Sequence, residues 1–177
     1  NSLPAGNYRF IVQDANGCQQ PLIVTIIELH PALTASHVIQ PVNCFSGSDG
    51  QVQFKINGGG APYSYQWMGT TQTSQHLQNV PAGNYTVIVT DAVGCTLSHV
   101  ATVTQPPAAL TATLLTKPAC AGSTGGRIEI LATGGTPPYQ YSIDDGNSFF
   151  EESTFASLVA GPYSVVVKDR NECMYKT

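Results

Sequence analysis

Five cysteines are the residues of this 177-residue chain whose type and spacing could do the most chemistry. Cys18, Cys95 and Cys173 are spaced by 77 and 78 residues and are called late cysteines below; Cys44 and Cys120, spaced by 76, are called early cysteines. Thiols at repeated positions form disulfides in exported proteins or bind zinc. No Cys-x-x-Cys pair is present and no histidine keeps a constant offset from a cysteine, so we expect disulfides and no metal site.

Two disulfide pairings fit these positions. Pairing within a repeat joins Cys44 to Cys95 and Cys120 to Cys173, and leaves Cys18 to a partner upstream. Pairing across a linker joins Cys18 to Cys44 and Cys95 to Cys120, and leaves Cys173 to a partner downstream. Bridged Cα atoms lie within about 7 Å, so the strand count decides. One strand over residues 148–158 puts both cysteines of a repeat at the same end, and two strands put them at opposite ends. We favour pairing within a repeat; reduced core cysteines are the remaining alternative.

Histidines and carboxylates offer little sign of catalysis. The four histidines are His30, His37, His76 and His99. They do not recur at equivalent positions, so no repeated metal site or catalytic base can be built from them. Glu151 and Glu152 are neighbours that would point to opposite faces of a strand, unlike the facing carboxylates of a glycoside hydrolase. We therefore expect a protein that is not an enzyme, without catalytic, cofactor-binding or metal-binding residues.

One acidic position does recur, at Asp14, Asp91 and Asp169. An aspartate beside a turn either binds calcium or accepts backbone N–H groups in an Asx turn, and we favour the turn.

A second polar cluster, Asp144, Asp145 and Asn147, lacks the glutamate that completes an EF-hand loop. Asp-Gly and Gly-Asn steps supply the positive φ angles of a tight turn. We therefore interpret residues 139–150 as a hairpin with these side chains at its tip.

Composition describes a globular chain with a weakly charged surface. Hydrophobic residues make up 42% and charged residues only 10%, with a net charge of −4. Nucleic-acid binding needs a basic surface, so we expect no nucleic-acid partner. The longest apolar run, residues 21–27, is far shorter than the roughly 20 residues that span a bilayer, and we expect no membrane insertion by this segment. A surface covered by Thr, Ser, Gln and Asn favours an extracellular setting.

One repeated unit organises the chain, since residues 3–18, 80–95 and 159–173 can be laid over one another. The front half of the unit is present twice, in residues 44–65 and 120–141. These repeats predict three parts: 1–29, the end of a truncated repeat; 33–105, a complete repeat; and 110–177, a repeat truncated at its last strand. The chain opens and closes inside repeats, and we expect it to come from a longer protein. Short proline-containing linkers, 28–32 and 105–109, predict a semi-rigid rod.

Apolar residues alternate with period two and Gly-Pro clusters separate the runs, so we expect strands and essentially no helix. Tyr8, Tyr85 and Tyr163 recur after an Ala-Gly turn, as in the tyrosine corner of immunoglobulin-like sandwiches. Trp67 has Ile143 at its equivalent position and is expected in the core. The predicted fold is all-β: tandem immunoglobulin-like β-sandwich repeats forming an elongated rod.

The motifs together resemble the SprB repeat. They are a Cys followed closely by Gly, a Gly-Gly pair followed by Pro-Tyr-x-Tyr, and Ala-Gly-x-Tyr-x-Val-x-Val-x-Asp-x-x-Gly-Cys. The resemblance implies a very long cell-surface adhesin of gliding Bacteroidota, secreted by the type IX system and displayed on the outer membrane. The last repeat departs from the pattern, with Glu172 in place of the Gly before the cysteine and Pro162 in place of the usual Asn or Thr.

The expected function is a structural and adhesive repeat segment of a long secreted filament of the gliding-motility type, located at the cell surface. Its expected partners are an extracellular surface or polysaccharide, and other cell-surface proteins of the filament or gliding machinery. The alternative hypothesis is a carbohydrate-binding or spacer module of a large secreted enzyme. A third hypothesis is a receptor for a soluble ligand or a partner protein. Flanking sequence would separate the first two, since further repeats favour the filament.

Overall fold

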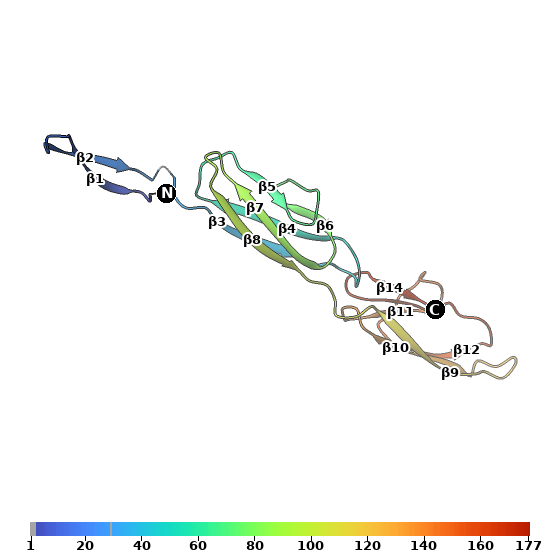
Figure 1. The fold of residues 1–177 in the computed structure, drawn as a ribbon. Coiled ribbons are helices and arrows are strands. Elements are labelled where there is room, and N and C mark those ends of the chain that lie inside the picture. Colours follow the sequence, from blue (N-terminus) through green and yellow to red (C-terminus); the bar gives the residue numbers. More distant parts are fainter. Residues whose placement is uncertain (1–2, 29) are drawn as a thin grey trace.

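The computed structural model describes residues 3–28 and 30–177, and its regular structure is made of fourteen β-strands. The described part contains no helix, which confirms the all-β prediction. A two-stranded hairpin and two sandwiches follow one another along one long axis (Figure 1). No helix in the described chain has the length and apolarity to cross a membrane. Leu29, part of the predicted first linker, lies outside the described residues.

The first complete repeat is a sandwich of two three-stranded antiparallel sheets. One sheet has the order β3-β4-β6 and the other β5-β7-β8. The strands are β3 (Thr34–Gln40), β4 (Gly50–Asn57), β5 (Ser64–Trp67), β6 (Leu77–Val80), β7 (Gly83–Thr90) and β8 (Thr96–Val103). This is the two-sheet arrangement of an immunoglobulin-like domain, with the tyrosine corner at the start of β7.

The second repeat has the same topology, with sheets β9-β10-β12 and β11-β13-β14. Its strands are β9 (Thr111–Lys117), β10 (Gly126–Thr133), β11 (Gln140–Ser142), β12 (Thr154–Leu158), β13 (Val166–Lys168) and β14 (Met174–Lys176). The last strand is three residues long, where its counterpart β8 has eight.

The N-terminal hairpin consists of β1 (Gly6–Gln13) and β2 (Gln19–Ile26). It pairs in the same register as β7 and β8, since Gly6 faces Ile26 as Gly83 faces Val103. The hairpin is therefore the last two strands of a repeat.

Alternating apolar residues from both sheets form the core of each sandwich. In the first repeat, Phe54, Trp67, Val87 and Val89 are at most 1% exposed. The indole N–H of Trp67 donates to the Ser74 carbonyl at 3.0 Å, so this polar atom is satisfied inside the core.

The chain changes sheets halfway along each repeat. β5 pairs with the second half of β7, and β6 then pairs with the first half of β4, so that two half-length strands make a single passage. In the second repeat, Phe150 forms a bridge with Tyr141 of one sheet before β12 joins the other. Residues 148–158 are therefore not one strand. An odd number of passages separates the early from the late cysteine of a repeat, and the two lie at opposite ends.

Each tyrosine expected at a corner donates a hydrogen bond to a carbonyl four residues earlier. The hydroxyl groups of Tyr8, Tyr85 and Tyr163 reach the carbonyl oxygens of residues 4, 81 and 159 at 2.6, 2.9 and 3.0 Å. The bond closes the turn that leads into the strand carrying the tyrosine.

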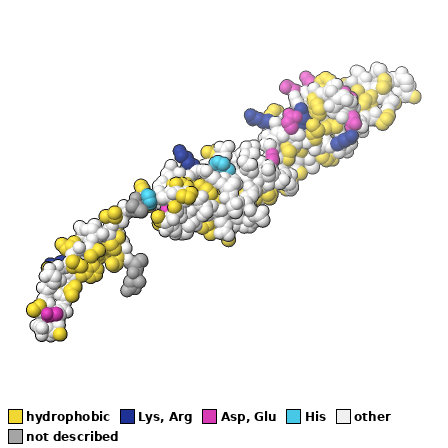
Figure 2. Space-filling view, turned by 90° about the horizontal axis from the view of Figure 1, so that it is seen from above, with side chains coloured by type: hydrophobic (Ala, Val, Ile, Leu, Met, Phe, Trp, Pro, Cys, Tyr) yellow, Lys and Arg dark blue, Asp and Glu magenta, His cyan; other side chains and the backbone are white. Residues whose placement is uncertain are grey.

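Charge is distributed unevenly along the rod. Residues 33–105 contain only Asp49, Lys55 and Asp91 as charged residues. Figure 2 shows acidic and basic side chains gathered over the second repeat and hydrophobic side chains over the hairpin. The first complete repeat thus presents an almost neutral polar surface.

Candidate functional site: the inter-repeat junction

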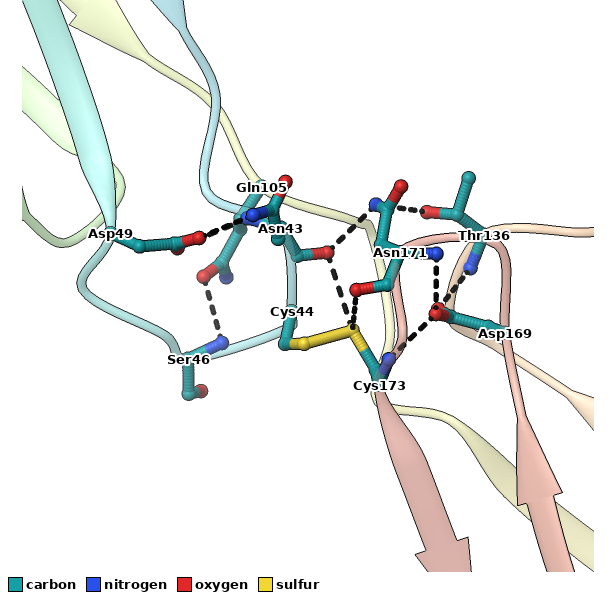
Figure 3. Close-up of a disulfide and its surroundings, with 9 residues drawn as sticks. All are labelled: Asn43, Cys44, Ser46, Asp49, Gln105, Thr136, Asp169, Asn171 and Cys173. Carbon is teal, nitrogen blue, oxygen red and sulfur yellow. Dashed lines mark hydrogen bonds between the residues drawn. A yellow bond between two sulfur atoms is a disulfide. The ribbon is translucent and has the colours of Figure 1, made fainter.

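Each repeat has two poles that differ in chemistry. The entry pole, where the linker arrives, carries the Gly-Gly turn and the late cysteine: residues 58–63 and 91–95 in the first repeat, 134–139 and 169–173 in the second. The exit pole carries the early-cysteine turn: residues 41–49 and 118–125. The exit pole of the first repeat meets the entry pole of the second, and this junction is the candidate site (Figure 3).

A disulfide joins Cys44 to Cys173 across the junction, with 5.7 Å between Cα atoms. Both predicted pairings were wrong for these two residues, because neither joined an early cysteine to the late cysteine of the next repeat. Cys18, Cys95 and Cys120 are exposed and not disulfide-bonded.

Strand length explains the correction. Within the first repeat, Cys44 and Cys95 lie at opposite poles, separated by the eight residues of β4. At about 3.3 Å per residue this is roughly 25 Å, well beyond the reach of a disulfide. The across-linker pairing fails for the same reason, because the late cysteine of one repeat lies at the far pole from the next repeat. Only an early cysteine and the late cysteine of the next repeat come together.

Asp169 shapes the loop that presents Cys173. One carboxylate oxygen accepts the N–H groups of Asn171 and Cys173 at 2.8 and 2.9 Å, and the other accepts the N–H of Thr136 at 2.8 Å. The side chain is 3% exposed. The loop with the cysteine is thereby fastened to the Gly-Gly turn beside it.

Asp91 makes the equivalent three bonds, and Asp14 makes the two within its own loop. Asp91 accepts the N–H groups of Val93, Cys95 and Gly60 at 3.0, 2.8 and 3.0 Å, and Asp14 accepts those of Asn16 and Cys18 at 2.9 and 2.8 Å. The Gly60 N–H holds the pKa of Asp91 below its ordinary value. The repeated aspartate forms an Asx turn, which was the favoured interpretation.

The exit pole is held by its own polar contacts. Asn43 donates its backbone N–H and its side-chain amide to the two carboxylate oxygens of Asp49, at 3.1 and 2.6 Å. The Gln105 side-chain oxygen accepts the N–H of Ser46 at 2.9 Å. Because Gln105 belongs to the linker, this bond ties the early-cysteine turn to the segment that leads into the next repeat.

Asn171 adds a polar contact beside the disulfide. Its amide nitrogen donates to the carbonyl oxygen of Asn43 at 2.9 Å and to the Thr136 hydroxyl at 3.2 Å. Sequence reasoning did not single out Asn43, Gln105 or Asn171. Asn171 has Val93 as its counterpart in the preceding repeat, so no repeated pattern marks it.

The linker is bound to the entry pole by the Gly-Gly turn. Gly135 donates its N–H to the Ala108 carbonyl at 2.9 Å, as Gly59 does to Pro31 at 2.7 Å. Gly134, at φ +73°, lies so close to the Ala109 carbonyl that a Cβ would collide with it. Glycine is required here by both backbone conformation and space.

Glu172 takes the place of a glycine in the loop that presents Cys173. It has φ +64°, against +84° for Gly17 and +87° for Gly94. Its carboxylate lies 3.1 Å from the ammonium of Lys168. The loop therefore keeps the conformation of the other copies, and Glu172 adopts the left-handed backbone region that glycine occupies there.

The other candidate residues do not converge on one centre. His37 Nδ1 and His99 Nε2 are 2.7 Å apart, and burial lowers the pKa of His99. His76 Nδ1 accepts the Phe54 N–H at 3.1 Å. His30 lies near Gly60, at the entry pole of the first repeat. Across residues 3–28 and 30–177, no three His, Cys, Asp or Glu side chains are grouped to hold a metal ion.

The hairpin tip in the second repeat is organised by its own polar groups. Asp144 accepts the Ser142 hydroxyl at 2.7 Å and the Ser148 N–H at 3.0 Å, and the Ser142 hydroxyl holds the pKa of Asp144 below its ordinary value. Asp145 and Gly146 supply positive φ angles. These carboxylates are thus turn residues.

A groove of about 650 Å³ lies on the second repeat, near the junction. Tyr139, Tyr141, Glu151, Arg170 and Glu172 are among its lining residues. Tyr141 is buried, and the Tyr139 hydroxyl donates to the Gly134 carbonyl at 2.7 Å. Glu152 does not line the groove, so the two neighbouring glutamates do not face one substrate position.

Comparison with protein families gives a match at both repeats. The model of the SprB repeat matches residues 36–71 and 115–148. In each repeat the matched segment includes the early cysteine and the Gly-Gly turn. No curated protein matches the chain.

Two solved structures align with this chain. The ectodomain of human desmocollin-1 is 14% identical with a TM-score of 0.37, over 93% of this chain and 39% of that one. Extracellular domains 3–5 of Drosophila OTK are 17% identical with a TM-score of 0.32, over 98% of this chain and 68% of that one. This chain therefore spans well under half the length of the desmocollin ectodomain.

Proposed function

We propose that this chain, whose residues 36–71 and 115–148 match the SprB repeat, is a tension-resisting, adhesive segment of a secreted cell-surface filament of the gliding-motility type. The observation that supports this most directly is the Cys44–Cys173 bond. It joins two successive repeats at the poles through which any pull along the rod must pass.

The bond changes the path of force. A pull on the two ends runs along the chain to Cys44, across the disulfide to Cys173, and out through β14. The segment between the two cysteines, separated by 129 positions, is bypassed. At about 3.5 Å per residue this is roughly 450 Å of contour length that a pull cannot release while the bond is intact.

The bond also stabilises the repeats against unfolding. Closing a loop of this length contributes about 5 kcal/mol in the chain-entropy model. The linker is held in parallel by the Gly135–Ala108 and Ser46–Gln105 hydrogen bonds. Such a junction suits a long stalk, where many weak contacts to a surface or polysaccharide sum to avidity.

The role in attachment is tested on cells. Antibodies against residues 33–177 should label intact cells, and a strain lacking the parent protein should lose attachment to glass or agar and lose gliding. A strain in which the parent gene is restored is the control. Labelling only after permeabilisation would contradict display at the surface, and unchanged attachment would contradict adhesion.

The role in resisting tension is tested on the chain itself by single-molecule stretching. Reduction should add roughly 450 Å of contour length in the unmodified chain, given about 3.5 Å per residue. The Cys173→Ser variant should show the long extension without reductant, and Cys18→Ser should behave as the unmodified chain. Equal extension with and without reductant would contradict the bypass.

The carbohydrate-binding alternative is supported by the groove on the second repeat, whose lining includes Glu151, Arg170 and Glu172. Sugar rings usually stack on an exposed aromatic face, and the groove tyrosines are buried or half-buried. Saturable binding of an oligosaccharide that Arg170→Ala abolishes would favour this alternative.

A further inference from the structure

We propose that the Cys44–Cys173 bond is one member of a continuous series, in which every early cysteine bonds to the late cysteine of the following repeat. Cys120 then bonds to the late cysteine of the repeat that follows, about 129 residues further along. Cys95 and Cys18 bond to early cysteines of preceding repeats. The partner of each pole is thus another repeat of the same kind.

The Cys44–Cys173 bond shows that an exit pole and an entry pole can be joined by a disulfide. The two late cysteines that are not disulfide-bonded lie in loops of the same conformation as the loop of Cys173. Cys173, Cys95 and Cys18 each donate the backbone N–H to the aspartate four residues earlier, at 2.9, 2.8 and 2.8 Å. In each loop the aspartate N–H donates back to the cysteine carbonyl, at 3.0 to 3.1 Å. The late thiols are therefore presented in the same way.

The early cysteines also share one turn. The Cys44 carbonyl accepts the N–H of Gly47 at 2.9 Å, and the Cys120 carbonyl accepts that of Ser123 at 3.0 Å. The residue two after each cysteine has positive φ, +59° at Ser46 and +75° at Gly122. The exit pole of the second repeat therefore presents Cys120 as the first repeat presents Cys44.

Space for a partner is open at Cys95. A cavity of about 440 Å³ at the entry pole of the first repeat is lined by Cys95, Val93 and Asp91 and by linker residues that include Pro31. At the bonded junction, the corresponding pole of the second repeat is occupied by the turn that carries Cys44 (Figure 3). An early-cysteine turn of a preceding repeat is the occupant that this cavity fits.

The chemistry of each bond is thiol–disulfide exchange. The two thiols lose two protons and two electrons, and the acceptor is the disulfide of an oxidoreductase, which leaves as a dithiol. Cys18, Cys95 and Cys120 are exposed and so accessible to that exchange.

A series of such bonds makes overlapping rings along the chain. The ring closed by Cys44 and Cys173 contains Cys120, so the next ring begins before the first ends. Every peptide bond between the first early cysteine and the last late cysteine of the array is then bridged by at least one disulfide. Cutting the backbone at any single site within this span leaves the filament in one piece.

This inference rests on the proposed function only in taking the chain as part of a longer array of repeats. Its test reads covalent bonds, whereas the test of adhesion reads attachment, so either can fail alone.

The test is a non-reducing peptide map of the parent protein, collected from cells without reductant and with free thiols alkylated. The Cys44–Cys173 pair serves as the internal control for retained disulfides. We expect the Cys120 peptide linked to a late-cysteine peptide of the following repeat, and the Cys95 peptide linked to an early-cysteine peptide of the preceding one. Alkylated Cys95 and Cys120, or a bond between them, would overturn the proposal.

A second measurement uses limited proteolysis of the same protein. Chains cut once within a repeat should run at full length on a non-reducing gel and as fragments after reduction. Fragments that separate without reductant, when the Cys44–Cys173 control is intact, would overturn the overlapping series.

Discussion

The N-terminal hairpin and its copy in the first complete repeat share sequence, register and hydrogen bonds, yet they differ in burial. Val12 of β1 is 61% exposed, whereas the equivalent Val89 of β7 is fully buried. Both pairs of strands carry the same cross-strand bond, from Thr25 to Asn7 and from Thr102 to Asn84, at 2.7 Å. The comparison teaches that local sequence sets the hairpin, and the opposing sheet sets the core.

The opposing sheet is what the hairpin lacks in this chain. In the first repeat, β7 and β8 lie across from β3, β4 and β6, whose inward side chains Val52 and Phe54 share the core with Val87 and Val89. The hairpin has no such second layer among the described residues, so Phe10 and Ile23 stay 46% and 71% exposed. A sheet with one apolar face needs a second layer to bury it.

The largest difference between the two regions should come from the disulfide. Cys173→Ser should lower the free energy of unfolding of the two repeats by about 5 kcal/mol, because the unfolded chain regains its loop entropy. Cys18→Ser, in the same loop type of the hairpin, should leave it unchanged. Urea unfolding with free thiols blocked, read from the fluorescence of Trp67 and from circular dichroism, measures both. Coincident curves for the two variants would contradict the expectation.

The burial difference itself predicts the next largest effect. Val89→Ala should destabilise the first repeat by about 2 kcal/mol, since it removes buried methyl groups and leaves a cavity. Val12→Ala is the matched control, and should change stability little. The midpoint of urea unfolding distinguishes them, followed by Trp67 fluorescence for the first repeat and by circular dichroism for the hairpin. A similar loss in both variants would mean that the hairpin face is covered in solution.

A smaller, pH-dependent effect on stability should come from Asp91 in the first complete repeat. The native pKa of Asp91 is lowered, so the unfolded chain binds more protons between that pKa and about 4. The stability that this carboxylate contributes is present above about pH 4 and is lost as the pH falls through the native pKa. Asp91→Asn should remove this loss in thermal unfolding read by Trp67. Asp14→Asn, in the hairpin outside the sandwich that contains Trp67, is the control variant. A pH profile unaltered by Asp91→Asn would contradict it.

The smallest effect concerns the loop that presents Cys173, the third copy of the late-cysteine loop. Glu172→Gly should stabilise the second repeat by about 1 kcal/mol, because glycine adopts the left-handed conformation without strain. The contact of its 71% exposed side chain with Lys168 contributes less. Calorimetry of the second repeat measures the gain. The reciprocal change, Gly94→Ala, should destabilise the first repeat, and a loss of stability in Glu172→Gly would show that the Lys168 contact dominates.

Much of the fold could be predicted from residue patterns. Period-two alternation identified strands such as β4 and β10, and the spacing of Tyr8, Tyr85 and Tyr163 identified one corner in three copies. The Asx turns followed from aspartate beside a turn, a local interaction within four residues. These features depend on residues that are close in sequence, so sequence patterns predict them.

The contacts at the junction between the two repeats could not be predicted from residue patterns. Whether residues 148–158 form one strand or two depends on which sheet Phe150 and β12 join, and that is settled by packing against strands far away in sequence. The contact of Asn171 with Asn43 spans 128 positions and has no repeated signal.

By itself, then, the sequence determined a tandem array of β repeats with cysteines at regular positions, because strand patterns and turns arise from local stereochemistry. Only the tertiary structure decided that Cys44 bonds to Cys173, because a disulfide forms between thiols that lie within a few ångströms. That proximity depends on the direction of every strand between them and on how one repeat is placed on the next.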